Sequence, residues 1–270
     1  MIKLNINPEL IHLHGSFGIQ IYGLFIALGI IISVFLLKRN KRFTQLHLEN
    51  TYLDIVGVSI LAGCIGGRFL EVISEPALYP QWYDWFAFWQ GGFSVLGSIL
   101  GVIIIIPLYL KRIKVPILPL FDLISIYAPL LQSIARLGCF FAGCCYGVAT
   151  THSFAVTYTN PHTLAAYGIA VHPTQLYSSA LLLCIFLFMY FIGQRMFTKR
   201  GELFAIYLVL AAYERFVVDF WRADRIMISK FLSFHQFVAL GIITFIGLLY
   251  YASILNPMLH FTSHGDPGKE

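Results

Sequence analysis

The stretch Phe17–Leu37, FGIQIYGLFIALGIIISVFLL, contains no charged residue and is apolar at almost every position. A helix needs about 20 predominantly apolar residues to cross the hydrocarbon core of a bilayer, so this stretch is long enough to span it. A cleavable signal peptide is not expected, because residues 1–16 lack a basic region and the apolar run exceeds the usual ~7–15 residues. The sequence therefore predicts a membrane anchor near the N-terminus.

Six further apolar runs predict an all-α polytopic membrane protein with about seven transmembrane helices. They are Tyr52–Ser74, Phe93–Leu110, Ile117–Ala135, Thr174–Gly193, Leu203–Trp221 and Phe234–Leu255. Of the 270 residues, 58% are hydrophobic and 11% charged, whereas roughly 25% are charged in an ordinary soluble domain. A water-soluble fold could not bury so much apolar surface. We expect one membrane-embedded domain over residues 1–263, followed by a disordered polar tail over residues 264–270.

Basic residues follow the first, third and fifth predicted spans. They are Lys38, Arg39, Lys41, Arg42, Lys111, Arg112, Lys114, Arg195, Lys199 and Arg200. Because cytoplasmic loops carry an excess of lysine and arginine, we expect the N-terminus outside and the C-terminus in the cytoplasm. These loops also explain the basic character of the chain, so no nucleic-acid partner is expected. Arg222, Arg225 and Lys230 fall on the outer side against this rule. Either the topology differs there, or these charges bind something, which is the interpretation we favour.

Two connections on the outer side are candidates for recognition. Residues 136–171, between spans four and five, are too polar to span the membrane and too long for a tight turn, so they predict a small outward-facing head. Residues 76–90 are rich in aromatic side chains, including Trp82, Trp85 and Trp89, which favour the membrane interface. This second segment is either an interfacial belt or a lipid-facing cover for a cleft.

Arginines in apolar segments are costly and are kept for function or as paired structure. Arg68 precedes Glu71 by three residues in the second span, so the two can pair on one helix face. Arg136 precedes a segment with several glycines, which allow tight turns and close approach to a ligand; they are Gly138, Gly143 and Gly147. The Arg136 guanidinium could bind a phosphate through two hydrogen bonds, or it could be an arginine that snorkels to the membrane surface.

Near the end of span six, Arg215, Asp219 and Arg222 fall on one helix face. They form either an internal ladder of salt bridges or a source of cations for an anionic headgroup. Residues 172–177, HPTQLY, open span five. Thr174 or His172 could cap this helix, or the polar side chains of the segment could line a pocket. Several arginines and few carboxylates at the outer face point to a phosphate-bearing lipid.

Three cysteines, Cys139, Cys144 and Cys145, cluster in the predicted head. Outside the membrane a disulfide is plausible, for example from Cys139 to either of the others, and packing as small apolar side chains is the alternative. Fewer than four ligands are at hand, so no metal site is expected. Cys64 and Cys184 lie inside spans and are expected to pack there.

These motifs resemble those of prolipoprotein diacylglyceryl transferases, the bacterial enzymes that modify the lipobox cysteine of lipoprotein precursors. The resemblance covers nearly the whole chain. Its elements, in order, are Tyr22-Gly23-Leu24, Gly66-Gly67-Arg68, Gly91-Gly92, Arg136 with its glycine-rich turn, the segment from His172 to Tyr177, and Glu214-Arg215-Phe216 with Arg222.

The resemblance implies an activity at the outer face of the bacterial cytoplasmic (inner) membrane, without a cofactor. The diacylglyceryl group of phosphatidylglycerol moves to the cysteine sulfur of a prolipoprotein, forming a thioether and releasing glycerol phosphate. Arg136 and Arg215 are expected to stabilise the departing phosphate, with Arg68 and Arg222 behind them. The expected partners are therefore phosphatidylglycerol, lipobox precursors and the bilayer itself. Gly138, Gly143 and Gly147 are expected to lie against the lipid.

The sequence departs from the family pattern where a base would be expected. Leu96 stands where the best-known members carry a histidine, and Cys139, Ala142 and Cys144 stand at positions that usually hold asparagines and an acidic residue. His172, Tyr22 and Glu214 are possible replacements for the base, and of these His172 and Tyr22 are expected to act in catalysis together with Arg136 and Arg215.

Two other functions are weighed against the transferase. A transporter or flippase for an anionic lipid or solute would also need buried charges. Paired inverted halves are not evident, however, and Arg136 and Arg222 sit at span ends rather than at mid-membrane. A relative that serves another acceptor, or that has lost activity, is the third hypothesis, because of Leu96.

Overall fold

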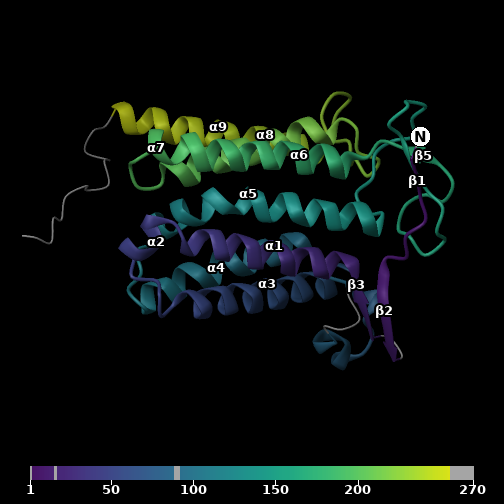
Figure 1. Cartoon of the computed structure of the whole chain (residues 1–270), viewed down its shortest axis with the longest axis horizontal. Helices are drawn as coiled ribbons and strands as arrows, with labels where there is room; N and C mark the ends of the chain where they lie inside the picture. Colours follow the sequence, from purple (N-terminus) through teal and green to yellow (C-terminus); the bar gives the residue numbers. More distant parts are fainter. Residues whose placement is uncertain (1, 15–16, 88–91, 256–270) are drawn as a thin grey trace, which may run out of the picture.

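Long helices run side by side along the molecule, and short strands gather at one end (Figure 1). The computed structural model describes residues 2–14, 17–87 and 92–255. The expected tail, residues 264–270, and Trp89 lie outside the described residues. The long helices are α1 (Ile21–Lys38), α3 (Tyr52–Ser74), α4 (Val95–Arg112), α5 (Ile117–Ala142), α6 (Thr174–Phe188), α8 (Glu202–Asp219) and α9 (Phe234–Leu255).

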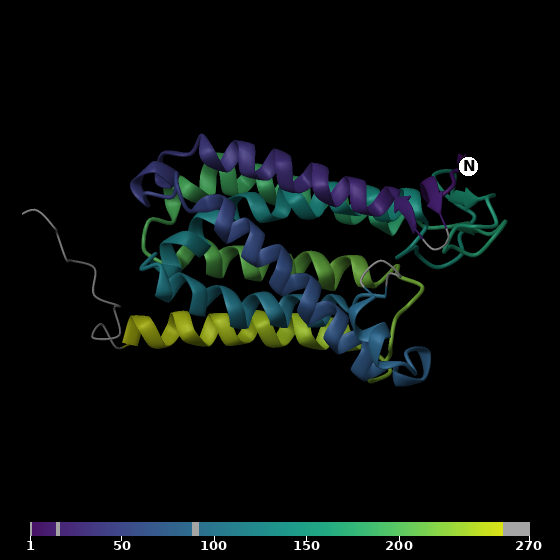
Figure 2. The same cartoon turned by 90° about the horizontal axis from the view of Figure 1, so that it is seen from below.

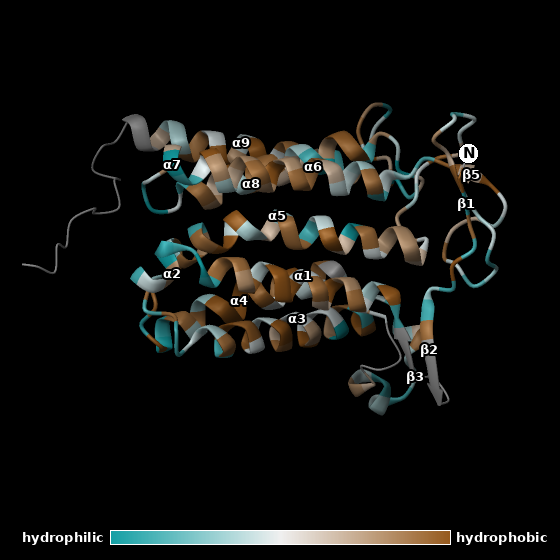
Figure 3. Cartoon of the chain, viewed as in Figure 1, coloured by the Kyte–Doolittle hydropathy of each residue, from teal (hydrophilic) through white to brown (hydrophobic). Residues whose placement is uncertain are grey.

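Within the described residues, five helical segments are long and apolar enough to cross a membrane. They are Ile21–Lys38, Tyr52–Ser74, Ile117–Ala142, Thr174–Met196 and Phe234–Ala252. The fourth runs from α6 through a π-helical turn, η4 (Met189–Gly193), into α7 (Gln194–Met196). Apolar residues dominate the helices along their length (Figure 3), and large side chains such as Ile31 on α1 are exposed. These properties agree with the predicted polytopic membrane protein, while α4 and α8 are outside this set of five.

The first predicted span begins too early. The backbone of Phe17–Gln20 forms strand β3, which pairs antiparallel with β2 (Glu9–His14), and helix α1 starts only at Ile21. The Ile21 amide donates to the carbonyl of Pro8 at 2.9 Å. Strand pairing thus supplies hydrogen-bond partners that the expected helix would have supplied internally.

The strand-bearing end also corrects the purely helical fold class. Strand β1 (Ile2–Leu4) pairs in parallel with β4 (Val156–Tyr158), and β4 pairs antiparallel with β5 (Ala170–Val171). Both β4 and β5 belong to the predicted head, so the head is completed by the first strand of the chain. Sequence pattern could not reveal this pairing, because it joins short segments far apart in the chain.

Two helix ends differ from the predicted ones. Helix α5 continues past Ala135 to Ala142 and stops where Gly143 adopts a left-handed φ of 76°. Glycine takes that conformation without strain, so the helix ends at Gly143 and not before Arg136. Arg136, Gly138 and Cys139 therefore lie in a helix and not in a turn. Helix α8 ends at Asp219, so Arg222 lies beyond it.

Helix α5 lies at the centre of the bundle. Its apolar residues Leu123 and Ile126 are fully buried, in one cluster with Phe186 of α6 and Leu203 of α8. On the far side, α3 and α4 cross closely, since a Cβ added to Gly97 would collide with the backbone of α3. Small residues at such a crossing let helix backbones approach each other in a membrane. A second view shows the same lengthwise arrangement of helices (Figure 2).

The loops that the sequence predicts to be cytoplasmic lie together at one end of the bundle. The basic residues that follow α1, α4 and α7 share one end with α2 (Lys41–Gln45), whereas the strands lie at the other (Figure 1). Hydrophilic residues colour α2 and the loops of the first end (Figure 3). The sorting of basic loops to one end is the arrangement that the sequence predicts.

Candidate functional site

Three of the predicted arginines meet at the strand-bearing end of α5 and α8. Arg136 comes from α5, Arg215 from α8 and Arg222 from the loop that follows α8. The charges of all three act on the carboxylate of Glu214, which is buried on α8. Glu214 also accepts a hydrogen bond from the Ser178 hydroxyl of α6. The structure thus brings together residues from three helices and the loop that follows α8, as a shared site requires.

The three arginines differ in how far their own chain occupies them. Arg222 is buried and binds Asp224 through two hydrogen bonds, Nε to Oδ1 at 2.8 Å and NH2 to Oδ2 at 2.5 Å. Arg215 lies 3.6 Å from Asp219, and its side chain is 23% exposed. Arg136 is partly exposed and forms no hydrogen bond or ion pair with any residue in the described part of the chain. Arg136 and Arg215 therefore retain N–H groups for an anion.

The pair of Arg222 and Asp224 is electrostatically tight. Burial alone would lower the pKa of Arg222, but Asp224 and the neighbouring Cys145 together outweigh burial and raise it. The hydrogen bonds from Arg222 lower the pKa of Asp224. Both groups stay charged at neutral pH, so this arginine is already neutralised by a carboxylate.

Asp219 is fully buried and joins α8 to the segment that follows. Besides Arg215, it lies 3.4 Å from Nε of Arg225 and 3.7 Å from Nδ1 of His235, and it accepts a hydrogen bond from the Ser233 hydroxyl. Of the predicted ladder of salt bridges, the pair of Arg215 and Asp219 is therefore correct. The pair of Asp219 and Arg222 is wrong, because the helix ends at Asp219 and Arg222 binds Asp224.

Two glycines of the predicted turn allow neighbouring segments to pack closely around the site. A Cβ on Gly138 would lie 2.8 Å from Cβ of Phe25 and 3.3 Å from Cα of Tyr22, so Gly138 brings α5 against α1. A Cβ on Gly147 would lie 2.6 Å from both Cβ of His172 and the carbonyl oxygen of Trp221. Both glycines serve close packing of the chain. Contact of Gly138, Gly143 and Gly147 with lipid stays a prediction.

Backbone bonds hold residues 146–148 between the loop after α8 and the start of α6. The Gly147 amide donates to His172 at 2.9 Å, the Val148 amide to Trp221 at 2.8 Å, and the Ala223 amide to Tyr146 at 3.1 Å. This crossing fixes the head against the arginines and places His172 and Trp221 next to each other.

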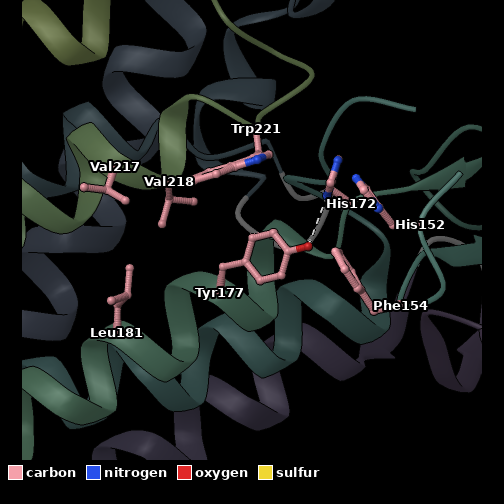
Figure 4. A pocket seen from close by; sticks show the side chains of 8 residues that line it. All are labelled: His152, Phe154, His172, Tyr177, Leu181, Val217, Val218 and Trp221. Carbon is pink, nitrogen blue, oxygen red and sulfur yellow. Dashed lines mark hydrogen bonds between the residues drawn. The ribbon is translucent and has the colours of Figure 1, made fainter. Parts of the chain in front are cut away.

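A pocket of 560 Å³ opens between α6, α8 and the head (Figure 4). Its walls are mostly apolar and aromatic, formed by His152, Phe154, His172, Tyr177, Leu181, Val217, Val218 and Trp221. Tyr177 points to His172, whose Nδ1 lies 3.1 Å from the tyrosine hydroxyl. Burial, and then the neighbouring His152, lower the pKa of His172. Its imidazole is therefore neutral at pH 7.

The predicted side-chain cap at the start of α6 is not formed. Pro173 is the N-cap residue, and no side chain caps the helix. Thr174 instead donates to the carbonyl of Cys145, and Gln175 to that of Cys144, each at 2.7 Å. Gln175 thus faces the cysteine segment rather than the pocket, which is lined by His172 and Tyr177 as predicted.

The three head cysteines are free thiols, and their sulfur atoms lie within 4.8 Å of one another. The predicted disulfide is not formed between them. Arg136 and all three thiols act electrostatically on Tyr22 of α1, so Tyr22 also belongs to this site. Cys64 and Cys184, which were expected to be packed inside their spans, are exposed on α3 and α6.

Arg68 belongs to a different environment. It is 1% exposed, it donates to the carbonyls of Asp84 at 2.5 Å and Gly92 at 3.2 Å, and it lies over the Tyr79 ring at 4.5 Å. The predicted ion pair with Glu71 is wrong, because these acceptors lie in the connection between α3 and α4. Arg68 therefore anchors that connection.

The aromatic connection itself is exposed. It forms two 3-10 turns, η1 (Pro76–Leu78) and η2 (Trp82–Phe86), and it presents Trp82 and Phe86 to the surroundings. This exposure agrees with the predicted interfacial belt. Leu96, 61% exposed on α4, offers no group that could accept a proton.

Sequence reasoning missed several residues of the site. Asp224 follows Arg222 by two residues, and this spacing could have indicated a pair. His152 and Phe154 enter the pocket from an irregular segment whose sequence carries no periodic signal.

Comparisons with known proteins agree with these features. A family model described as prolipoprotein diacylglyceryl transferase matches residues 8–252. A phosphatidylglycerol-prolipoprotein diacylglyceryl transferase of Clostridium tetani is 36% identical over 231 residues, covering 83% of this chain and 90% of the relative. A protein of Clostridium perfringens, named as transferase 2 of this kind, is 32% identical, with 87% and 91% covered. The Thermotoga maritima transferase is 28% identical, with 92% and 86% covered.

Proposed function

The chain belongs to the prolipoprotein diacylglyceryl transferase family, and from this premise we propose how its side chains perform the reaction. The protein is a transferase that carries out the first step of lipoprotein maturation. It moves the diacylglyceryl group of phosphatidylglycerol to the lipobox cysteine of a prolipoprotein. A carbon–sulfur bond forms, the carbon–oxygen bond to phosphate breaks, and glycerol phosphate leaves.

Arg136 and Arg215 hold the phosphate of phosphatidylglycerol in this proposal. The observation that carries it is that both guanidinium groups retain N–H donors beside the buried Glu214, whereas Arg222 is bound by Asp224. Charge builds up on the phosphate as the carbon–oxygen bond breaks, so positioned guanidinium groups stabilise the transition state more than the bound lipid. Arg222 supports these two arginines through its positive charge, and its bonds to Asp224 fix the loop after α8.

Glu214 keeps the two arginines in place. The charges of all three arginines act on this carboxylate, which offsets part of their mutual repulsion when no lipid is bound. Glu214 accepts a hydrogen bond from Ser178 of α6 and itself lies on α8, so its carboxylate is tied to two helices. A fixed arrangement avoids reorganisation during the reaction, which is the advantage of a preorganised site.

The pocket beside the arginines suits the apolar part of a substrate. Trp221 and Val218 line it, and their neighbours Arg222 and Asp219 belong to the charged cluster. An amphipathic lipid needs a charged site and an apolar site next to each other. The arrangement therefore fits a phospholipid whose headgroup lies at the arginines.

The strand-bearing end faces outward in this proposal, and all seven long helices cross the membrane. Basic loops gather at the opposite end, which the preference of cytoplasmic loops for lysine and arginine assigns to the cytoplasm. Helix α8 then carries its charged residues inside a bundle rather than towards lipid, since Glu214 and Asp219 are buried. The head and the arginines meet prolipoproteins at the outer face.

His172 is the proposed proton acceptor among the three candidates. A cysteine thiol with a pKa of about 8.5 is mostly protonated at neutral pH, so the acceptor sulfur must lose its proton. Glu214 is occupied by Ser178 and by arginine charges, whereas His172 is neutral and lines the pocket. Tyr22, on which the charge of Arg136 acts, positions the lipid.

Transfer can be tested with the purified protein. The protein is incubated with phosphatidylglycerol and a lipobox peptide, and the peptide is analysed by mass spectrometry. We expect a diacylglyceryl adduct on the cysteine and none on a peptide in which serine replaces that cysteine. Absence of the adduct, under conditions where the Clostridium tetani relative produces it, would contradict the proposed function.

A further inference from the structure

Three thiols meet at the edge of the arginine site, and no step proposed above uses them. Cys139 lies in the last turns of α5, and Cys144 and Cys145 follow directly after its end. Their sulfur atoms all lie within 4.8 Å of one another. Cys139 is buried, whereas the other two are partly exposed, so the group is open on one side.

The backbone around the thiols is held from several directions. The Cys144 amide donates to the carbonyl of Cys139 at 3.2 Å, and Thr174 and Gln175 of α6 hold the carbonyls of Cys145 and Cys144. Cys145 adopts a φ of 59°, a left-handed conformation that non-glycine residues rarely take. The convergence of the three sulfur atoms is therefore maintained by the surrounding fold.

The geometry fits a thiophilic metal ion. Zinc binds thiolate sulfur at about 2.3 Å, which puts two sulfur atoms on a tetrahedral ion about 3.8 Å apart. Sulfur atoms within 4.8 Å of one another reach that spacing by small side-chain movements. Three protein ligands leave the fourth position of a tetrahedral ion open, as in catalytic zinc sites.

The charges around the thiols also fit. A divalent ion with three thiolates carries one net negative charge, and Arg222 and Arg136 both act on the Cys145 sulfur. The arginines can therefore balance the loaded site. Arg136 is also one of the two groups that hold the phosphate in the proposed function, so the loaded site would lie within the electrostatic reach of the phosphate-binding group.

We propose that Cys139, Cys144 and Cys145 bind Zn²⁺ and that the open fourth position takes the acceptor cysteine of the prolipoprotein. This inference rests on the proposed function for its second half. The acceptor sulfur binds the ion and gives up its proton to His172, the proton acceptor of the proposed function. Metal-bound thiols are deprotonated, so the ion supplies the activation that Leu96 cannot.

The transfer step then balances without an oxidant or reductant. The metal-bound sulfur attacks the glyceryl carbon of phosphatidylglycerol, forming the carbon–sulfur bond. The carbon–oxygen bond breaks, and its electron pair leaves with the phosphate oxygen held by Arg136 and Arg215. The thioether sulfur is neutral and a weaker ligand, so the product leaves the ion.

Metal binding is tested on the full chain in detergent, independently of activity. Purified protein is freed of metal under reducing conditions and titrated with Co²⁺, which stands in for Zn²⁺ and gives thiolate charge-transfer absorption. We expect one ion per chain, displaced by Zn²⁺. Cys139→Ser, Cys144→Ser and Cys145→Ser should each weaken binding, whereas the matched controls Cys64→Ser and Cys184→Ser should not. Wild-type protein without this absorption, or with absorption lost only in the controls, overturns the proposal.

A second measurement separates this proposal from the proposed function. Addition of a lipobox peptide should shift the Co²⁺ spectrum, and a peptide with serine in place of the cysteine should leave it unchanged. If the metal-free reduced protein transfers the diacylglyceryl group at the full rate, the metal proposal fails while the transferase function stands. If a disulfide forms within the cluster of the active protein and excludes Co²⁺, the proposal fails in the same way.

Discussion

Arg68 on α3 and Arg136 on α5 are both arginines in apolar helices, yet their surroundings are opposite. Arg68 is almost completely buried, with its guanidinium bound to two backbone carbonyls and stacked on Tyr79. Arg136 is partly exposed and has no hydrogen-bond partner among the described residues, although its charge, like those of Arg215 and Arg222, acts on Glu214. An arginine satisfied by its own backbone holds structure together, whereas one with unused donors in a charged site can serve a ligand.

The two regions also differ in what surrounds them. The environment of Arg68 is a connection between two helices, with exposed aromatic residues on its outside. The environment of Arg136 combines charged groups, a pocket and a set of thiols drawn from five parts of the chain. Convergence of distant segments on unused polar groups, rather than burial of a charge, marks the site.

The largest expected effect is that of Arg136→Ala. Loss of one group that stabilises transition-state charge lowers the rate by about 100- to 1000-fold. Because Arg136 has no described hydrogen-bond partner, the melting temperature should change little. Thioether formation by mass spectrometry and thermal unfolding measure the two quantities. Arg195→Ala, an exposed arginine at the opposite end, is the matched control and should keep full activity.

The variant His172→Gln tests the proton acceptor in the Arg136 region. It should lower the rate at pH 7 by about 100-fold, as loss of a general base does. Burial lowers the pKa of His172, so it is neutral at pH 7 and becomes protonated only below its usual value of about 6.5. Wild-type activity should therefore fall as the pH drops below about 6.5. The variant should lose this acidic limb. An unchanged limb in the variant would assign the proton acceptor to another group.

Arg68→Leu probes the other side of the comparison. The carbonyls of Asp84 and Gly92 lose charged donors, which should lower the free energy of unfolding by about 2–3 kcal/mol. The connection between α3 and α4 should also become more sensitive to proteases. Activity per folded molecule should stay close to that of wild type. A stable variant with no activity would move Arg68 into the lipid site.

Gly138→Ala should have the smallest effect. The new Cβ would meet Cβ of Phe25 at 2.8 Å, and such overpacking costs about 1–2 kcal/mol. Gly23→Ala is the matched control, because it lies in neighbouring α1 and its new Cβ would meet nothing within 4 Å. Chemical unfolding of both variants compares them. Equal stabilities would show that α1 and α5 adjust to the added methyl group.

The sequence predicts the helices well because apolar length is a local property. It predicts the grouping of Arg136, Arg215 and Arg222 because their spans end on the same side. Helix ends are less predictable: α5 runs on through Arg136 to Gly143, since the intervening residues are compatible with both helix and turn. The hydrogen-bond partners of the arginines cannot be predicted from the neighbouring sequence either. Arg222 turns to Asp224 and Arg68 to backbone carbonyls, choices that depend on where the chain leaves each helix.

The clearest test of the account asks which arginines hold phosphatidylglycerol. Native mass spectrometry of the purified protein measures lipid adducts for wild type, for the double variant Arg136→Ala with Arg215→Ala, and for Arg68→Ala. The double variant should lose the phosphatidylglycerol adduct, and Arg68→Ala should retain it. Retention in the double variant together with loss in Arg68→Ala would contradict this assignment of the arginines.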